Sequence, residues 1–262
     1  MEKKALFFDY DGTIIAGGTG KIPAEIPELF RELKARGHLL FLNTGRTRVL
    51  LDPHCRALPF DGYILGCGSA VELNEATLYE YKLPIDCCTQ IVEQMQALGI
   101  QGFLEGMNVL YYTRRFTDLG FRACRARYRR EGVTVKRADK LDDPFTKMYL
   151  RFPSAKRLDQ FQARWGRDFD FIDRGGRVRE LVPAGHTKAS GMQLVMERLG
   201  LKLENCYAFG DGNNDRPMLE LAPNSALIGA GNAELRKIVR YVSSSVSDGG
   251  LAEAVRAFRL VE

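Results

Sequence analysis

Residues able to do chemistry gather in four short segments of the chain. These are Asp9-Tyr10-Asp11-Gly12-Thr13, Asn43-Thr44-Gly45-Arg46, the isolated Lys188, and Gly210-Asp211-Gly212-Asn213-Asn214-Asp215. Three of the segments begin where an apolar run ends. Because the carboxyl ends of parallel strands border the ligand crevice of an open sheet, we expect Asp9, Thr44 and Asp211 to converge there. Lys188, in the first turn of a predicted helix, is expected to reach the same edge.

The side chains of these segments suit a magnesium ion and a phosphoryl group. Asp9, Asp211 and Asp215 offer hard oxygen ligands without sulfur or imidazole, and such a set favours Mg²⁺ over zinc. A Mg²⁺ ion allows carboxylates and a phosphate to share one site without prohibitive repulsion. The hydroxyl of Thr44 and the ammonium of Lys188 are groups that the remaining phosphoryl oxygens require.

Asp9 and Asp11 are candidates for covalent and acid–base chemistry. A carboxylate at the position of Asp9 can attack phosphorus and form an aspartyl-phosphate. Asp11 can protonate the leaving oxygen and then deprotonate water. Proton transfer by a positioned group of this kind accelerates a reaction roughly 10²- to 10⁴-fold. Taken singly, such residues have ordinary explanations, for example a turn for a D-x-D pair or a helix cap for Asp211 to Asp215. The ordered set, on an alternating pattern of strands and helices, therefore carries the hypothesis.

The elements that must hold these segments alternate between strand and helix at both ends of the chain. Near the N-terminus, apolar runs predict strands over residues 4–9, 38–43 and 62–65 and helices over 24–36 and 46–57. Toward the C-terminus we expect helices over 187–199 and 214–221 and strands over 206–209 and 226–228. Alternation of this kind is typical of right-handed βαβ units in a parallel sheet.

The middle of the chain has a different pattern. Between about Leu83 and Val182, β-rich segments at 109–113, 147–152, 169–172 and 178–182 accompany two helical patterns. Their spacing predicts an antiparallel sheet with helices on one face, inserted into an α/β core. We therefore expect a core of residues 1–82 and 184–262 and an inserted α+β domain of residues 83–183.

Composition excludes several classes of protein. The 262 residues are 45% hydrophobic and 27% charged, which excludes disorder, collagen and coiled coil. There is no run of 18 apolar residues, and the run before Asp9 is too short for a signal peptide, so we expect a soluble, cytoplasmic protein without a membrane partner. The six cysteines show no C-x-x-C spacing and are expected to be reduced thiols.

Much of the net charge of +5 lies between Arg114 and Arg137. This basic stretch has two interpretations, a nucleic-acid patch or a solvated helix face that also favours anionic small molecules. We favour the solvated face, because no nucleic-acid motif accompanies the charge. Arg122, Arg125 and Arg129 follow one face of a predicted helix, and we assign them no role in the site.

The ordered set resembles the haloacid dehalogenase superfamily, and specifically its Cof-type sugar-phosphate phosphatases of subfamily IIB. Four motifs carry the resemblance: D-x-D-G-T at Asp9–Thr13, T-G-R at Thr44–Arg46, the lysine at Lys188, and G-D-G-x-N-D-x-x-M-L at Gly210–Leu219. The resemblance implies a Rossmann-like parallel-sheet core with an inserted α+β cap of the C2B type that sets substrate specificity. It also implies Mg²⁺-dependent hydrolysis of small phosphomonoesters, above all sugar phosphates, through an aspartyl-phosphate.

The resemblance implies a role for each site residue as well. Asp9 would be the nucleophile, and it would bind Mg²⁺ together with Asp211 and the backbone carbonyl of Asp11. Asp11 would be the general acid and base. The phosphoryl group would be held by Thr44, Gly45 and Lys188. The phosphate, a metal-bound water or neighbouring groups would be oriented by Asn214 and Asp215.

One segment departs from the family pattern, and three rival functions stay open. Gly66-Cys67-Gly68-Ser69 stands where many relatives have Asn-Gly-Ala, which leaves the substrate undetermined. A phosphomutase of the same cap class would return the phosphoryl group to a sugar instead of to water. A non-catalytic regulator would bind Mg²⁺ or phosphate without turnover, and a nucleic-acid-binding module would use the basic stretch.

Overall fold

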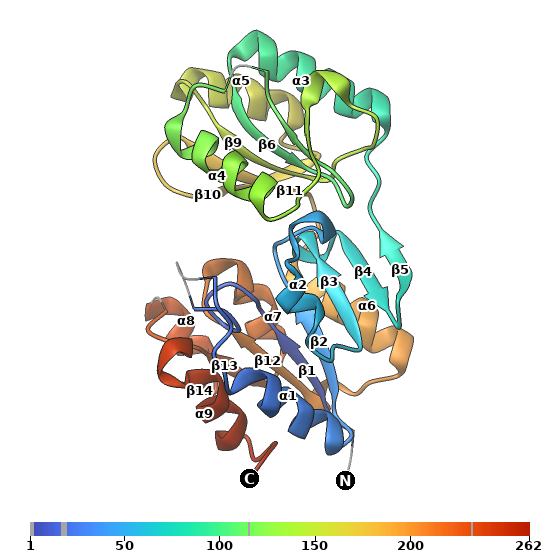
Figure 1. The fold of residues 1–262 in the computed structure, drawn as a ribbon, viewed down its shortest axis with the longest axis vertical. Coiled ribbons are helices and arrows are strands. Elements are labelled where there is room, and N and C mark those ends of the chain that lie inside the picture. The colour runs from blue at the N-terminus through green and yellow to red at the C-terminus, as the bar shows by residue number, and fades with distance from the viewer. Residues whose placement is uncertain (1–2, 17–19, 115, 232) are drawn as a thin grey trace. The chain divides into compact units, whose positions relative to one another are not determined.

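A computed structural model describes residues 3–16, 20–114, 116–231 and 233–262 of the chain (Figure 1). Contacts within the chain divide it into two compact units. The core unit consists of Met1–Gly45, Pro53–Tyr79 and Thr187–Glu262, and the inserted unit consists of Arg46–Asp52 and Glu80–His186. Each unit has its own sheet and its own buried cluster of apolar side chains.

The core unit is built on an eight-stranded sheet in the order β14-β13-β12-β1-β2-β3-β4-β5. The strands from β14 to β3 in this order run parallel to their neighbours, and β4 folds back antiparallel to β3. Their bounds are β1 (Ala5–Phe8), β2 (Leu39–Asn43), β3 (Gly62–Leu65), β4 (Ala70–Leu73), β5 (Ala76–Glu80), β12 (Cys206–Gly210), β13 (Asn224–Leu227) and β14 (Tyr241–Val242). The predicted α/β core with a parallel sheet is confirmed.

Helices cover both faces of this sheet, which is why its central strands consist of nearly unbroken apolar runs. On one face, Met192 and Leu219 pack in the same buried cluster as Phe7 of β1. On the other face, the ring of Phe8 lies 4.8 Å from the ring of Phe30, measured between centroids. The helices of the core unit are α1 (Ile26–Ala35), α2 (Pro53–Arg56), α6 (Lys188–Leu199), α7 (Arg216–Leu221), α8 (Ala233–Ile238) and α9 (Gly250–Ala257).

The single helix predicted over residues 46–57 is wrong. A 3₁₀ turn at Arg48–Leu50 and the short α2 form there instead. Proline disfavours helical backbone at the residue before it, so a continuous helix cannot easily pass Pro53. Val49 and Leu50 pack on an apolar cluster of the inserted unit, and this contact holds the segment out of the helix that its pattern suggests.

The inserted unit contains a six-stranded sheet in the order β10-β11-β9-β6-β7-β8. Its paired strands are antiparallel except for β7 and β8, which run parallel. Their bounds are β6 (Gln101–Glu105), β7 (Leu110–Tyr112), β8 (Val135–Arg137), β9 (Lys147–Arg151), β10 (Phe169–Asp173) and β11 (Val178–Pro183). A largely antiparallel sheet with helices is the α+β arrangement that the sequence predicts for this part of the chain.

The described part of the inserted unit has three helices of two turns or more, α3 (Ile85–Leu98), α4 (Leu119–Arg130) and α5 (Ala155–Trp165). Met95 of α3 and Phe161 of α5 share a cluster with Leu104 of β6, whereas Phe121 of α4 packs on Phe103. Successive residues of a strand point to opposite faces, so α4 covers the face opposite α3 and α5. The prediction of two helical patterns on one face is therefore wrong, because the many arginines of α4 obscure its apolar periodicity.

Most arginines of the basic stretch lie at the surface of α4. The guanidinium of Arg125 lies over the rings of Tyr112 and Phe116 at 4.6 and 5.3 Å from their centroids, and that of Arg129 lies 5.7 Å from the centroid of Tyr112. Arg115, which belongs to the same stretch, lies outside the described residues. Across the described ranges, each helix is too short or too polar to cross a membrane.

Candidate active site

Asp9 stands one residue beyond the carboxyl end of β1. β1 pairs in parallel with β12 so that Phe8 lies opposite Phe209, and the N–H of Asp9 donates to the carbonyl oxygen of Phe209 at 2.9 Å. Asp211 leaves β12 directly after Gly210, at the same edge of the sheet. The parallel register therefore brings two carboxylates from opposite ends of the chain to neighbouring strand ends.

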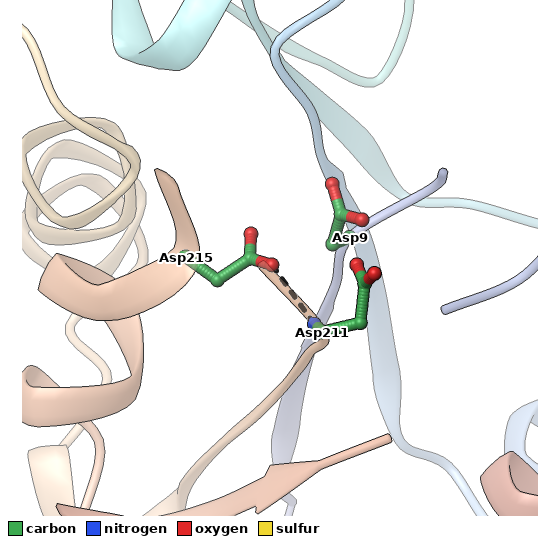
Figure 2. Close-up of side chains that lie close together, drawn as sticks. All are labelled: Asp9, Asp211 and Asp215. Carbon is green, nitrogen blue, oxygen red and sulfur yellow. Dashed lines mark hydrogen bonds between the residues drawn. The ribbon is translucent and has the colours of Figure 1, made fainter. Parts of the chain in front are cut away.

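Asp9, Asp211 and Asp215 form a cluster of carboxylates whose ligand oxygens lie within 4.8 Å of one another (Figure 2). Asp9 is 4% exposed and Asp215 is fully buried. A Mg²⁺ ion takes hard oxygen ligands, and negative charge gathered in a buried place favours a divalent cation. The residues present therefore fit a Mg²⁺ ion at this strand edge. The side chain of Asp11 is exposed and is not among the three clustered carboxylates.

Lys188 enters the cluster from the first residue of α6. A capping box sets this position, because the Thr187 hydroxyl accepts from the N–H of Ser190 at 3.1 Å and the Ser190 hydroxyl accepts from the N–H of Thr187 at 3.0 Å. The Lys188 side chain is fully buried, and its ammonium donates to both Asp9 and Asp215. Burial alone would lower the pKa of this ammonium, but the charges of Asp215 and Asp9 outweigh it and raise that pKa.

Both carboxylate oxygens of Asp215 are occupied by partners in the protein. Oδ2 accepts from the backbone N–H of Asp211 at 2.9 Å and of Gly212 at 2.8 Å, as the dashed line in Figure 2 shows for Asp211. Oδ1 accepts from Lys188. Asp215 therefore fixes the loop that carries Asp211 and holds the ammonium of Lys188.

Two carboxylates of the cluster, those of Asp9 and Asp211, are hard to ionise in the absence of a cation. Burial, followed by the charge of Asp215, raises the pKa of Asp9 well above its ordinary value. The same two causes, in the same order, raise the pKa of Asp211 to about 6. Desolvation and like charges both disfavour the ionised form of a carboxyl group. A bound divalent cation would relieve both effects.

Thr44 lies at the end of β2, the other neighbour of β1 in the sheet. The register pairs Phe8 with Leu42, so Asn43 is level with Asp9 and Thr44 lies one residue further. Thr44 is 1% exposed, and its N–H donates to the carbonyl oxygen of Ile64 at 2.9 Å. Gly45 follows it directly, as the last residue of this segment in the core unit.

Position 12 must be glycine because the backbone there passes close to the carboxylate of Asp211. Gly12 has a φ of +94°, and a Cβ added there would lie 2.1 Å from Oδ2 of Asp211. Only glycine adopts this backbone conformation freely and leaves room for the carboxylate. The turn after Asp11 therefore wraps closely around Asp211, which explains the Asp-Gly pair in the first segment.

Residues 6–255 match the sequence profile of a family described as haloacid dehalogenase-like hydrolases. The matched range includes all four chemistry-bearing segments. The chain belongs to the haloacid dehalogenase-like hydrolases. It is therefore an enzyme of the hydrolase class, and the family predicted from the sequence motifs is confirmed.

Several relatives of this haloacid dehalogenase-like hydrolase match over most of their length. A Bacillus subtilis protein named "Putative phosphatase YkrA" is 27% identical over 100% of both chains. The Escherichia coli "HMP-PP phosphatase" is 26% identical over 87% of this chain and 85% of its own. Among solved structures, the subclass IIB sugar phosphatase BT4131 superposes with a TM-score of 0.82 at 20% identity, over 98% of this chain and 100% of that one. This structural likeness confirms the fold, including the α+β insertion.

Two buried residues of this haloacid dehalogenase-like hydrolase support the site and were given no role by the sequence analysis. Asn43 donates from Nδ2 to the carbonyl oxygen of Lys188 at 3.0 Å, which ties β2 to the first turn of α6. Cys67 adopts a left-handed conformation with φ of 57°, and its N–H donates to the carbonyl oxygen of Thr44 at 3.0 Å. The glycines on both sides of Cys67 are the sequence signal of that tight turn. Asn214 is half-buried in the 3₁₀ turn that ends at Asp215.

Proposed function

We propose that this hydrolase is a Mg²⁺-dependent phosphatase that hydrolyses small phosphomonoesters, sugar phosphates among them, through an aspartyl-phosphate on Asp9. The observation that carries the proposal is the position of the Asp9 carboxylate. It is buried at a strand end, lies within 4.8 Å of Asp211 and Asp215, and forms an ion pair with Lys188. A carboxylate beside an ammonium and a cation-binding cluster is placed to attack an anionic phosphorus. The names of the relatives support the same chemistry.

The proposal gives each group of the cluster one task. The carboxylates of Asp9 and Asp211 and the backbone carbonyl of Asp11 would hold Mg²⁺, which when bound would offset the negative charge of the carboxylates and of the phosphate. Asp215, with both oxygens occupied, would position Lys188. The residues assigned to the phosphoryl oxygens are Thr44, Gly45, Lys188 and Asn214.

The first half-reaction forms a covalent intermediate. An oxygen of Asp9 bonds to phosphorus while the bond from phosphorus to the ester oxygen breaks. Asp11 gives its proton to the departing oxygen, so the alcohol leaves neutral. The buried ammonium of Lys188 remains beside the reacting oxygens and stabilises the charge that develops on them.

The second half-reaction returns the enzyme to its starting state. Water attacks phosphorus, Asp11 takes the proton of that water, and the bond from phosphorus to Asp9 breaks. Inorganic phosphate leaves and the Asp9 carboxylate is restored. The exposure of the Asp11 side chain suits this role, because the group must exchange protons with a leaving alcohol and with water.

The test is release of inorganic phosphate from a panel of phosphorylated metabolites, with Mg²⁺ and with EDTA. We expect turnover with Mg²⁺, and loss of turnover in EDTA and in Asp9→Asn. The matched control is Asp159→Asn, which removes an exposed carboxylate of α5. An Asp9→Asn protein that folds normally and still releases phosphate would overturn the assignment of the nucleophile.

The same assay separates the rival functions. A phosphomutase would need a bisphosphate activator and would return the phosphoryl group to a sugar, so steady phosphate release without an activator argues against it. A non-catalytic regulator would bind Mg²⁺ or phosphate with no turnover on any member of the panel. The division into a core of residues 1–82 and 184–262 and a specificity domain of residues 83–183 stays a prediction, as does the cytoplasmic location.

A further inference from the structure

A cavity of about 430 Å³ lies in the core unit, at the amino ends of the neighbouring strands β12, β13 and β14 (Figure 1). Among the residues that line it, Tyr207 is the second residue of β12, Asn224 begins β13 and Tyr241 begins β14. Phe258, which directly follows the carboxyl end of α9, supplies a further wall. Asp211 follows the opposite end of β12, so the cavity and the acidic cluster lie at opposite edges of the parallel sheet.

Three aromatic rings form the apolar part of the cavity wall. The ring of Phe258 meets those of Tyr207 and Tyr241 edge to face, with centroids 5.4 and 6.3 Å away. Phe258 and Tyr241 are half-buried, and the hydroxyl of Tyr241 donates to Glu253 at 2.8 Å. Rings that are packed against one another and fixed by a hydrogen bond form a wall that is in place before a ligand binds.

Two guanidinium groups line the same cavity, and no carboxylate is found among its described lining residues. Arg240 donates from Nη1 to Oδ1 of Asn224 at 3.0 Å, and this neutral partner leaves its charge uncompensated. Within the described ranges, the guanidinium of Arg259 has neither a hydrogen bond nor an ion pair. Nζ of Lys4 lies 5.3 Å from the centroid of Tyr207 and adds a third positive charge beside the wall.

The carboxylates near this cavity do not offset its three cations. Glu253, which binds the hydroxyl of Tyr241, also accepts from the N–H of Ser244 at 3.0 Å and from its hydroxyl at 2.7 Å. Glu204, whose backbone carbonyl lies beside the first residue of β13, pairs with Lys202 at 3.8 Å. Three positive charges therefore face one carboxylate that neutral donors already satisfy, and positive charge remains in excess.

The backbone of Arg259 adopts a conformation that favours glycine. Its φ is +54°, and its N–H donates to the carbonyl oxygen of Arg256 at 2.8 Å, just beyond the end of α9. Helices commonly end on a glycine in this left-handed conformation, which costs free energy for a residue with a Cβ. An arginine at such a position, with its side chain at the wall of a cavity, is typical of a residue kept for its side chain.

The charges and the volume together define the ligand. A phosphate monoester carries close to two negative charges at neutral pH, and the planar fork of a guanidinium binds phosphate through two parallel hydrogen bonds. A cavity of about 430 Å³ is larger than inorganic phosphate requires, and the rings of its wall suit contact with another flat ring. We propose that this cavity is a second ligand site, which binds a phosphate monoester carrying a flat ring, with Arg240 and Arg259 on the phosphate.

The test measures binding of adenosine 5′-monophosphate to the full chain by calorimetry, in EDTA and at low salt. Arg259→Gly and Arg240→Gln should each weaken binding roughly 10-fold or more, because each removes a charged donor to the phosphate. Arg259→Gly should unfold at a temperature no lower than that of the wild type, since glycine adopts the left-handed backbone freely, so misfolding cannot account for the lost affinity. The control Arg256→Gln removes an exposed arginine of α9 and should stay within about twofold of the wild type.

Two further probes separate the parts of the ligand. Adenosine, which lacks the phosphate, should bind far more weakly than adenosine 5′-monophosphate. Inorganic phosphate, which lacks the ring, should also bind more weakly and should lose affinity in Arg259→Gly. Equal affinity for inorganic phosphate and adenosine 5′-monophosphate would overturn the role of the ring. Absence of binding to the wild type at millimolar concentration, or the same affinity in Arg259→Gly and Arg240→Gln as in the wild type, would overturn the site itself. Because binding is measured without metal, neither result depends on the phosphatase function proposed above.

Discussion

Replacing Asp211 by asparagine should stabilise the metal-free protein while it abolishes Mg²⁺ binding and turnover. The reason is the cluster of three carboxylates, whose ligand oxygens lie within 4.8 Å of one another. The ammonium of Lys188 forms ion pairs with Asp9 and Asp215 of this cluster. Asparagine has nearly the same shape as aspartate but cannot ionise. The substitution therefore removes repulsion from the empty site without opening a cavity.

Two calculations from the structure give the expected gain in the free energy of unfolding. The pKa of Asp211 is raised from 3.8 to about 6, which corresponds to about 3 kcal/mol if the group were fully shielded from water. Coulomb repulsion between two unit charges at 4.8 Å gives about 3 kcal/mol at an effective dielectric constant of about 20. Asp211 is partly exposed, so solvent reduces both values, and we expect Asp211→Asn to gain about 1 to 3 kcal/mol at pH 7.

The sign of the pH dependence follows from the raised pKa of Asp211. Between pH 4 and 6 the folded protein binds more protons at this carboxyl than the unfolded chain does, so the free energy of unfolding falls as pH rises through that window. Above about pH 6, the ionised carboxylate of Asp211 lowers the free energy of unfolding by its full amount. In Asp211→Asn this contribution is absent, so the variant and the wild type should converge as pH falls toward 4.

Urea unfolding in EDTA, at a series of pH values, measures this difference, and a repeat with Mg²⁺ measures the effect of the metal. Mg²⁺ should stabilise the wild type through binding to the folded state and should leave Asp211→Asn nearly unchanged. Glu197→Gln, which removes an exposed carboxylate of α6, should stay within about 0.5 kcal/mol of the wild type. The reasoning is refuted if Asp211→Asn is less stable than the wild type at pH 7 in EDTA, or if both share one pH profile.

Three further predictions follow from the same site. Gly12→Ala should lower Mg²⁺ affinity and kcat/KM at least tenfold, measured by calorimetry and phosphate release, because the new Cβ would fall 2.1 Å from Asp211 Oδ2; unchanged affinity would contradict the close approach. Lys188→Met should destabilise the protein by about 3 to 5 kcal/mol in urea at pH 7, since it leaves Asp9 and Asp215 without their ammonium, and the loss should shrink toward acid pH. Asp11→Asn should keep the fold and accumulate phosphorylated protein, visible by intact mass spectrometry after rapid quenching with a reactive ester; its absence would argue against Asp11 as the group that activates water.

The positions of Asp9, Thr44 and Asp211 show why part of the site could be predicted from the sequence. Each follows an apolar run. A parallel strand that is buried on both faces has such a run in its sequence, whichever strands lie beside it. The rule that parallel strands end at one edge of a sheet then places the three residues together. Lys188 could be placed from the helix predicted over residues 187–199, because its first turn was expected at the same edge of the sheet.

The failures lie where contacts distant in sequence decide the structure. Val49 and Leu50 are adjacent apolar residues within the predicted helix, yet they pack on an apolar cluster of the inserted unit, and a 3₁₀ turn forms there in place of the helix. The sheet face that α4 covers could not be predicted either. The helix packs through one buried residue, Phe121, whereas its sequence is rich in arginines. The burial of Glu105 at the end of β6 gave no signal in the sequence, since a carboxylate at a strand end is usually exposed.

The amino-acid sequence by itself determined the family, the strand ends that carry the acidic residues, and the kind of metal those residues suit, because these depend on local runs and short motifs. The tertiary structure was needed to show that Lys188 is shared between Asp9 and Asp215, that Asp215 binds the loop of Asp211, and that Glu105 is buried beside aromatic rings. The physical reason is that burial and pairing are properties of neighbours in space. A charge's pKa and its remaining hydrogen-bonding capacity follow from those neighbours, which the order of residues does not state.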